Sequence, residues 1–156
     1  MKKQIFILSG IIAVIDQLVK VLVMTSSVGN ISVPVVDNFF SLTYVENSGA
    51  AWGIFSGSRW FLIIISILSL YAIVKYFLLD IRVTRVEFVA YSLLLGGIIG
   101  NLIDRIVYGY VIDYADFRFG TYQFPVFNLA DSAIVIGACL VIIHLIRNAI
   151  KQRSKK

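Results

Sequence analysis

The chain has 156 residues, of which 59% are hydrophobic and only 15% are charged, and its mean hydropathy is +0.88. Soluble domains contain roughly 45–50% apolar residues, so this composition excludes an ordinary water-soluble domain and indicates a membrane protein. The net charge of +5 lies in clusters beside apolar stretches, which argues against a nucleic-acid partner. The single cysteine, Cys139, excludes an internal disulfide and a thiolate metal cluster.

Four apolar stretches are long enough to cross a hydrocarbon layer, which takes roughly 20 helical residues. In chain order they cover residues 5–24, 60–79, 88–107 and 131–150. No linker, low-complexity tract or repeat interrupts the chain. We therefore expect an all-α membrane protein with four transmembrane helices, folded as a single integral membrane domain over residues 1–156.

Basic residues predict the orientation of these helices. They precede the first stretch, surround the short connection between the second and third, and follow the fourth: Lys2, Lys3, Lys75, Arg82, Arg85, Arg147, Lys151, Arg153, Lys155 and Lys156. The positive-inside rule assigns such boundaries to the cytoplasm. Both termini are then cytoplasmic, and the connections 25–59 and 108–130 lie outside the cell membrane.

The two outer connections differ in composition. Residues 31–36 and 38–45 are rich in β-branched and aromatic side chains, with turn signals at Pro34 and at residues 47–49, so we expect a small extracytoplasmic β-sheet between the first and second helices. The other connection is dense in aromatic side chains: Tyr108, Tyr110, Tyr114, Phe117, Phe119, Tyr122, Phe124 and Phe127. These side chains fit either an aromatic belt at the membrane interface or a surface that faces a substrate.

Ionisable side chains inside a membrane span cost at least roughly 2.5–3.5 kcal/mol each at the bilayer centre, so each of them indicates a function or a partner. Asp16 and Lys20 are four residues apart, which places them on one helix face within pairing distance. Asn101, Asp104 and Arg105 similarly share a face of the third predicted helix. Two polar faces are therefore predicted within the membrane.

The two polar faces are predicted to lie at the same depth in the membrane. With a rise of about 1.5 Å per residue, the polar groups of both helices lie roughly 17–24 Å from the inner ends of their spans. Asp113 follows the outer end of the third span, and Asp131 begins the fourth. Gly96, Gly97 and Gly100 would allow another helix to approach the third closely. The sequence therefore predicts one polar site in the outer third of the membrane.

Carboxylates and amides dominate this site, which favours hydrolysis by a pair of aspartates. One carboxylate takes a proton from water, and the other carboxyl group donates a proton to the carbonyl or the leaving amine. Close approach in a medium of low dielectric constant raises one pKa of the pair and so separates the two roles. An aspartate before an apolar helix, as at Asp131, also fits the N-cap of that helix.

Other chemistries fit less well. A serine–lysine dyad of Ser132 and Lys20 is disfavoured because Asp16 would keep the lysine protonated. The only histidine, His144, lies towards the cytoplasmic side of the last span, so no metal site is expected. A small proton-coupled transporter would need its acid near the midplane. A non-enzymatic assembly factor, which would use the polar groups only to associate helices, leaves Asp113 outside the span unexplained.

Four motifs follow one another along the chain. They are Asp16-Gln17-x-x-Lys20, then Asn47-x-Gly49-Ala50-Ala51-Trp52-Gly53, then Gly100-Asn101-Leu102-Ile103-Asp104-Arg105 with Gly109-x-Val111-Ile112-Asp113-Tyr114, and Phe127-Asn128-x-Ala130-Asp131-Ser132. In this order and spacing they resemble the lipoprotein signal peptidases, or type II signal peptidases, over nearly the whole chain. Trp52 and Tyr114 stand where phenylalanine is more usual in that family, and Ile112 stands where valine is usual, which keeps the apolar character.

The resemblance implies an aspartyl endopeptidase of the bacterial cytoplasmic (inner) membrane, with its active site at the outer face. Its substrates would be diacylglyceryl-modified prolipoproteins, cut on the amino side of the lipid-modified cysteine. Asp113 and Asp131 match the catalytic aspartates of the family. The matching positions for substrate binding and support are Asn47, Gly49, Asn101, Asn128, Asp16, Lys20, Asp104 and Arg105. No metal or cofactor is implied, and we expect a monomer surrounded by membrane lipids.

Overall fold

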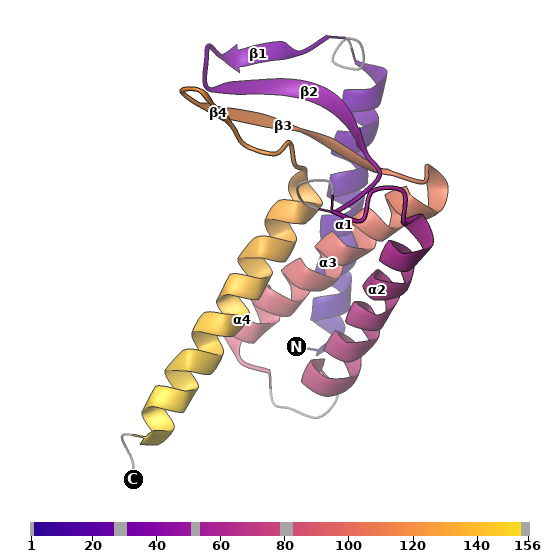
Figure 1. The fold of residues 1–156 in the computed structure, drawn as a ribbon. Helices are drawn as coiled ribbons and strands as arrows, with labels where there is room; N and C mark the ends of the chain where they lie inside the picture. The colour runs from indigo at the N-terminus through magenta and orange to yellow at the C-terminus, as the bar shows by residue number, and fades with distance from the viewer. Residues whose placement is uncertain (1, 27–30, 51–53, 79–82, 154–156) are drawn as a thin grey trace.

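The computed structural model describes residues 2–26, 31–50, 54–78 and 83–153 (Figure 1). Its helices are α1 (Lys2–Thr25), α2 (Arg59–Ala72), the π-helix η3 (Ile73–Leu78), α3 (Arg85–Val107) and α4 (Leu129–Arg153). Helix α3 is central, since it packs against α1, α2 and α4. The motif residues Ala51, Trp52 and Gly53 lie outside the described residues.

Three of the four predicted spans are present as long apolar helices. Within the described residues, α1, α3 and α4 are long and apolar enough to cross a membrane. The prediction of an α-helix over residues 60–79 was wrong in part, because α2 has 14 residues and would reach only about 21 Å. The apolar stretch continues from α2 as the six-residue η3, and Leu79 lies outside the described residues. The apolar stretch that the sequence predicted as the second span is therefore made of two kinds of helix.

Helix α3 begins three residues earlier than the sequence predicted, because a capping box fixes its start. The Thr84 hydroxyl accepts a hydrogen bond from the Glu87 backbone N–H at 3.3 Å, and the Glu87 carboxylate accepts one from the Thr84 backbone N–H at 2.8 Å. The two bonds satisfy N–H groups that lack partners in the first turn of a helix.

A four-stranded antiparallel sheet lies across one end of the helices, away from the start of α1 and the end of α4 (Figure 1). Its strands, in sheet order, are β1 (Val33–Val36), β2 (Phe40–Asn47), β3 (Val111–Phe119) and β4 (Tyr122–Gln123). The sequence correctly placed β1 and β2 between the first two helices. Confining the sheet to that connection was wrong, because β3 and β4 come from the aromatic connection and β3 pairs with β2.

The buried face of α1 shows how the chain is adapted to lipid. Its buried residues recur every three or four positions and include charged and small side chains: Ile5, Ser9, Ala13, Asp16, Lys20 and Val23. The large apolar side chains Ile7, Ile11, Leu18 and Leu22 are exposed instead. This distribution, with polar groups inside and apolar groups outside, is typical of a helix whose outer face contacts lipid.

The aromatic connection contributes to packing as well as to the surface. Tyr114 and Ala115 of β3 are buried with Val23 of α1, and Phe117 and Phe127 pack against this group. Phe119, near the end of β3, remains 55% exposed. The inner face of the sheet therefore closes over the end of α1, and it brings β3 towards the start of α4.

Candidate active site

Two carboxyl groups, one from a strand and one from a helix, line one pocket of about 920 Å³. Asp113 comes from β3 and Asp131 from the first turn of α4. Most of the other lining side chains are apolar, among them Val45, Val111, Phe124, Pro125, Val126, Phe127, Ile134, Val135 and Ile136. The pocket thus offers a largely apolar surface beside a pair of acids.

Each of the four carboxylate oxygens of this pair accepts one hydrogen bond from an amide N–H. For Asp113, the donors are the side chains of Asn128 at 2.7 Å and Asn47 at 2.8 Å. For Asp131, they are the Asn101 side chain at 2.7 Å and the Asn128 backbone at 3.1 Å. These neutral donors fix the orientation of both carboxyl groups without adding a counter-charge.

Asn128 is the direct link between the two aspartates. Its side-chain oxygen accepts a hydrogen bond from the Asp131 backbone N–H at 2.8 Å, while Asp131 accepts one from the Asn128 backbone N–H at 3.1 Å, which completes a capping box. The interpretation of Asp131 as the N-cap of the last helix was therefore wrong in position. Asn128 occupies the cap, because α4 begins at Leu129, and Asp131 is its partner three residues further on.

Two more side chains hold the first turn of α4. The Leu129 backbone N–H donates to the Tyr114 hydroxyl at 3.1 Å, and the Ala130 backbone N–H donates to Asp16 at 2.9 Å. Burial raises the pKa of Tyr114 to about 12, so its hydroxyl stays neutral. In the sequence, Tyr114 is notable only as an aromatic residue of this connection where phenylalanine is more usual, and the role of its hydroxyl, which a phenylalanine could not supply, was missed.

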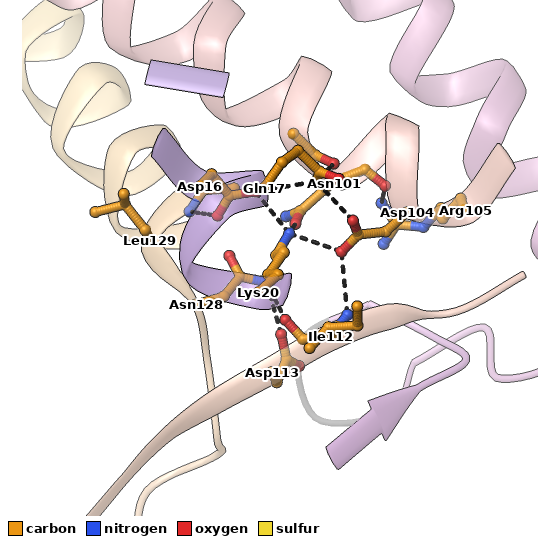
Figure 2. Close-up of polar contacts among 12 residues, drawn as sticks. Asp16, Gln17, Lys20, Asn101, Asp104, Arg105, Ile112, Asp113, Asn128 and Leu129 are labelled. Atoms are coloured by element: carbon orange, nitrogen blue, oxygen red, sulfur yellow. Dashed lines mark hydrogen bonds and ion pairs between the residues drawn. The ribbon is translucent and has the colours of Figure 1, made fainter. Parts of the chain in front are cut away.

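The predicted pair of Asp16 and Lys20 is present, and it belongs to a larger buried cluster (Figure 2). The Lys20 ammonium lies 2.8 Å from Asp16 and 2.7 Å from Asp104, and it donates to the Asn101 side-chain oxygen at 3.0 Å. Gln17 donates to Asp104 at 2.7 Å. Gln17 was expected only as part of its motif, although its place beside Asp16 already indicated a position near the polar faces.

Arginines connect the outer loop to the end of α3. The Arg105 guanidinium donates to the Gly49 carbonyl at 3.1 Å, and the Gly49 backbone N–H donates to Asn47 at 3.0 Å. Arg59, which no sequence motif singled out, donates to the carbonyls of Arg105 and Ile106, each at 2.8 Å. These contacts hold the loop that follows Asn47, the last residue of β2, at the edge of the pocket.

Burial, and after it the nearby charge of Asp131, raise the pKa of Asp113 to about 7. Hydrogen bonds from Asn47 and Asn128 and the charge of Lys20 oppose this shift. A carboxyl group that titrates near neutral pH beside a second carboxyl group can hold a proton for an acid–base reaction.

The raised pKa of Asp113 predicts a pH-dependent difference in stability from Asp113→Asn. Between the ordinary carboxyl value of 3.8 and about 7, the folded state holds one proton that the unfolded chain has released. Its free energy of unfolding should therefore fall by about 1.4 kcal/mol per pH unit in this range, relative to the variant. Thermal unfolding in detergent at pH 5 and pH 7 measures the difference, with Asp37→Asn as an exposed control. The prediction would be contradicted if the difference in unfolding free energy between wild type and Asp113→Asn were the same at pH 5 and pH 7.

The alternative catalytic groups are engaged elsewhere. The Ser132 hydroxyl donates to the Asn128 carbonyl at 3.1 Å, and Lys20 is held by two carboxylates, so the geometry does not favour a serine–lysine dyad. His144 lies 3.6 Å from Glu87, far along α4 from Asp131. Among the residues that the structure describes, no group of three His, Cys, Asp or Glu side chains is arranged to hold a metal ion.

Comparisons with known proteins agree with this architecture. The family model described as signal peptidase (SPase) II matches residues 8–147. The lipoprotein signal peptidase of Halothermothrix orenii is 43% identical over 90% of this chain and 94% of its own length, and that of Bacillus pumilus is 38% identical over 96% of each. A solved bacterial membrane enzyme, 38% identical, superimposes with a TM-score of 0.85 over 94% of this chain and 90% of its own. This chain therefore belongs to the signal peptidase II family and is a membrane peptidase.

Proposed function

We propose that this protein is an aspartic endopeptidase that removes signal peptides from diacylglyceryl-modified prolipoproteins. The names of the similar proteins support the substrate class. The observation that carries the catalytic type is the pair of Asp113 and Asp131 on one pocket, with amide donors on all four carboxylate oxygens. The family membership does not support the alternative of a proton-coupled transporter.

In the proposed reaction, Asp113 begins protonated, as its pKa of about 7 allows, and Asp131 begins ionised. Asp131 takes a proton from a water molecule as the water oxygen attacks the scissile carbonyl carbon, while Asp113 protonates the carbonyl oxygen. As the tetrahedral intermediate collapses, the C–N bond breaks and the proton held by Asp131 passes to the leaving amine, while one hydroxyl of the intermediate returns its proton to Asp113 as the new carbonyl forms. The neutral amides of Asn47, Asn101 and Asn128 keep both carboxyl groups oriented throughout.

The shape of the pocket supports a substrate with apolar groups on both sides of the scissile bond. One wall comes from the aliphatic side chains of α4, Ile134, Val135 and Ile136, and another from Phe124 and Phe127 of the aromatic connection. We propose that the part of the aromatic connection that contains Phe124 and Phe127 faces the substrate. Acyl chains and the apolar part of a signal peptide would both be compatible with such walls.

We further propose that the protein crosses the bacterial cytoplasmic membrane four times as one peptidase domain. Helices α2 and η3 together cover residues 59–78 and would form the second crossing, beside the three longer helices. Basic residues flank the helix ends that lie away from the sheet, which supports cytoplasmic termini and a site at the outer face. The proposed working form is a monomer within membrane lipids.

The substrate class can be tested with purified protein in detergent or lipid. We expect cleavage of a diacylglyceryl-modified prolipoprotein on the amino side of its modified cysteine, identified by mass spectrometry of the products. An otherwise identical precursor without the lipid is the control, and we expect it to be cut far more slowly because its cysteine is not anchored at the membrane surface. Equal rates for the two precursors would contradict the proposed substrate class.

A chelator tests the metal-free mechanism in the same assay. The proposed acid–base steps use only Asp113, Asp131 and water, so the rate with chelator should equal the rate without it. Loss of activity that an added divalent metal restores would contradict the proposal.

A further inference from the structure

Two buried carboxylates hold the backbone next to the proposed catalytic aspartates. Asp16 accepts a hydrogen bond from the Ala130 N–H at 2.9 Å, and Ala130 directly precedes Asp131. Asp104 accepts one from the Ile112 N–H at 3.1 Å, and Ile112 directly precedes Asp113. Each proposed catalytic residue is thus tied, through its neighbour in the chain, to a carboxylate of another helix.

The Lys20 ammonium joins these two carboxylates. It lies 2.8 Å from Asp16 and 2.7 Å from Asp104, and the three side chains are at most 1% exposed. Its third contact is the Asn101 side-chain oxygen at 3.0 Å, and the Asn101 amide donates to Asp131 at 2.7 Å. One cation therefore connects α1, α3, β3 and α4 through short polar contacts (Figure 2).

The three residues of this cluster, Asp16, Lys20 and Asp104, lie behind the pocket. Lys20, Asp16 and Asp104 are not among the described residues that line the pocket, although Asp113 and Asp131 are. A single buried cation between two anions also resists displacement, because moving either carboxylate leaves charge unpaired in a medium of low dielectric constant. The cluster is therefore placed to support the backbone beside the two aspartates and not to contact the reacting atoms.

We infer that Lys20 is a positioning residue that sets the separation and mutual orientation of Asp113 and Asp131 by holding the two carboxylates that bind their neighbouring backbone. The inference rests on the proposed function, since it takes these aspartates as the catalytic pair. Misplacement of a reacting group by about 1 Å can lower a rate about 100-fold. Lys20 therefore affects turnover more than substrate binding.

The first test replaces Lys20 with methionine, which keeps a side chain of similar length and removes the ammonium group. We expect kcat to fall about 10- to 100-fold, with KM within about threefold of wild type. The charge of Lys20 lowers the pKa of Asp113, so the alkaline limb of the kcat profile should also move to higher pH. Lys75→Met makes the same chemical change on η3, at the other end of the helices, and should leave kcat, KM and the pH profile unchanged. An unchanged kcat in Lys20→Met would overturn the inference, as would a loss confined to KM.

A second variant covers the case in which the lone substitution prevents folding. Lys20→Met with Asp104→Asn leaves the formal charge of the cluster unchanged, and the asparagine oxygen can still accept the Ile112 N–H. We expect a folded protein in detergent with a similarly lowered kcat. Wild-type kcat in this variant overturns the inference, and so does failure of both variants to fold, because Lys20 would then serve folding alone.

The assay separates this inference from the proposed function. Wild type and Asp113→Asn are measured beside the Lys20 variants. If Asp113→Asn cleaves like wild type, the proposed function fails and takes the inference with it. If Asp113→Asn is inactive while the Lys20 variants turn over normally, only the positioning role is overturned.

Discussion

Asparagine at either position 113 or position 131 should lower kcat by at least about 1,000-fold while leaving the fold intact. The substitution keeps the size of the side chain but removes the group that takes or donates a proton, and a positioned acid or base contributes about 100- to 10,000-fold to a rate. Amide donors hold both Asp113 and Asp131 at the pocket. We therefore expect the substitution to remove proton transfer and so to lower kcat. Initial rates with a diacylglyceryl-modified precursor measure it, together with size-exclusion profiles that check folding.

Asp116→Asn is the matched control for these variants. Asp116 is a buried carboxyl group of the same strand, but it contacts Arg118 and Gln123 and does not line the pocket. Its replacement should leave kcat within a few-fold of wild type. If either Asp113→Asn or Asp131→Asn keeps more than a tenth of the wild-type rate, that residue is not part of a catalytic pair.

Gly97→Ala should strongly destabilise the protein and also reduce its activity. A Cβ atom at this position would collide with the Ala130 carbonyl oxygen and would lie 2.8 Å from the Ile134 side chain. The backbone oxygen cannot rotate away, so α4 has to move, at a cost of about 1–3 kcal/mol or more. Because Ala130 precedes Asp131, the same movement displaces a proposed catalytic group, and kcat should fall by up to about 100-fold.

Gly10→Ala provides the comparison, since a Cβ atom on Gly10 meets nothing within 4 Å. Alanine favours a helix by about 1 kcal/mol over glycine, so this variant should be at least as stable as wild type and fully active. Thermal unfolding in detergent and initial rates report on both variants. Wild-type stability in Gly97→Ala would show that α3 and α4 do not pack as closely as described.

The sequence placed the polar faces of the first and third predicted helices at one depth, because an ionisable side chain inside a membrane span indicates a partner or a function. In the structure, Lys20 of α1 lies 2.7 Å from Asp104 of α3, so the two faces meet. The depth of the site in the membrane stays a prediction. The catalytic roles of Asp113 and Asp131 came from a family resemblance, and they remain proposals that the variants above would test.

Other features depend on contacts that a local pattern does not contain. The pairing of β2 with β3 joins segments separated by α2, η3 and α3, and alternation within each strand does not identify its partner. The cap of α4 was assigned to Asp131 because aspartate is a favoured cap, but Asn128 is equally favoured and occupies the position. The change from α2 to η3 at Ile73 left no signal in hydropathy, since both parts are mainly apolar and Lys75 is the one charged residue of η3.

The spacing of Asp16 and Lys20 has a consequence for biosynthesis. The two side chains are one turn apart on α1 and 2.8 Å from each other, so the first helix carries its own counter-ion when it enters the bilayer, before α3 has been made. Each charge alone would oppose insertion by roughly 2.5–3.5 kcal/mol at the membrane centre, and pairing within the helix reduces that penalty. The later arrival of Asp104 then gives the ammonium its second anion, so completion of the cluster coincides with assembly of the helices.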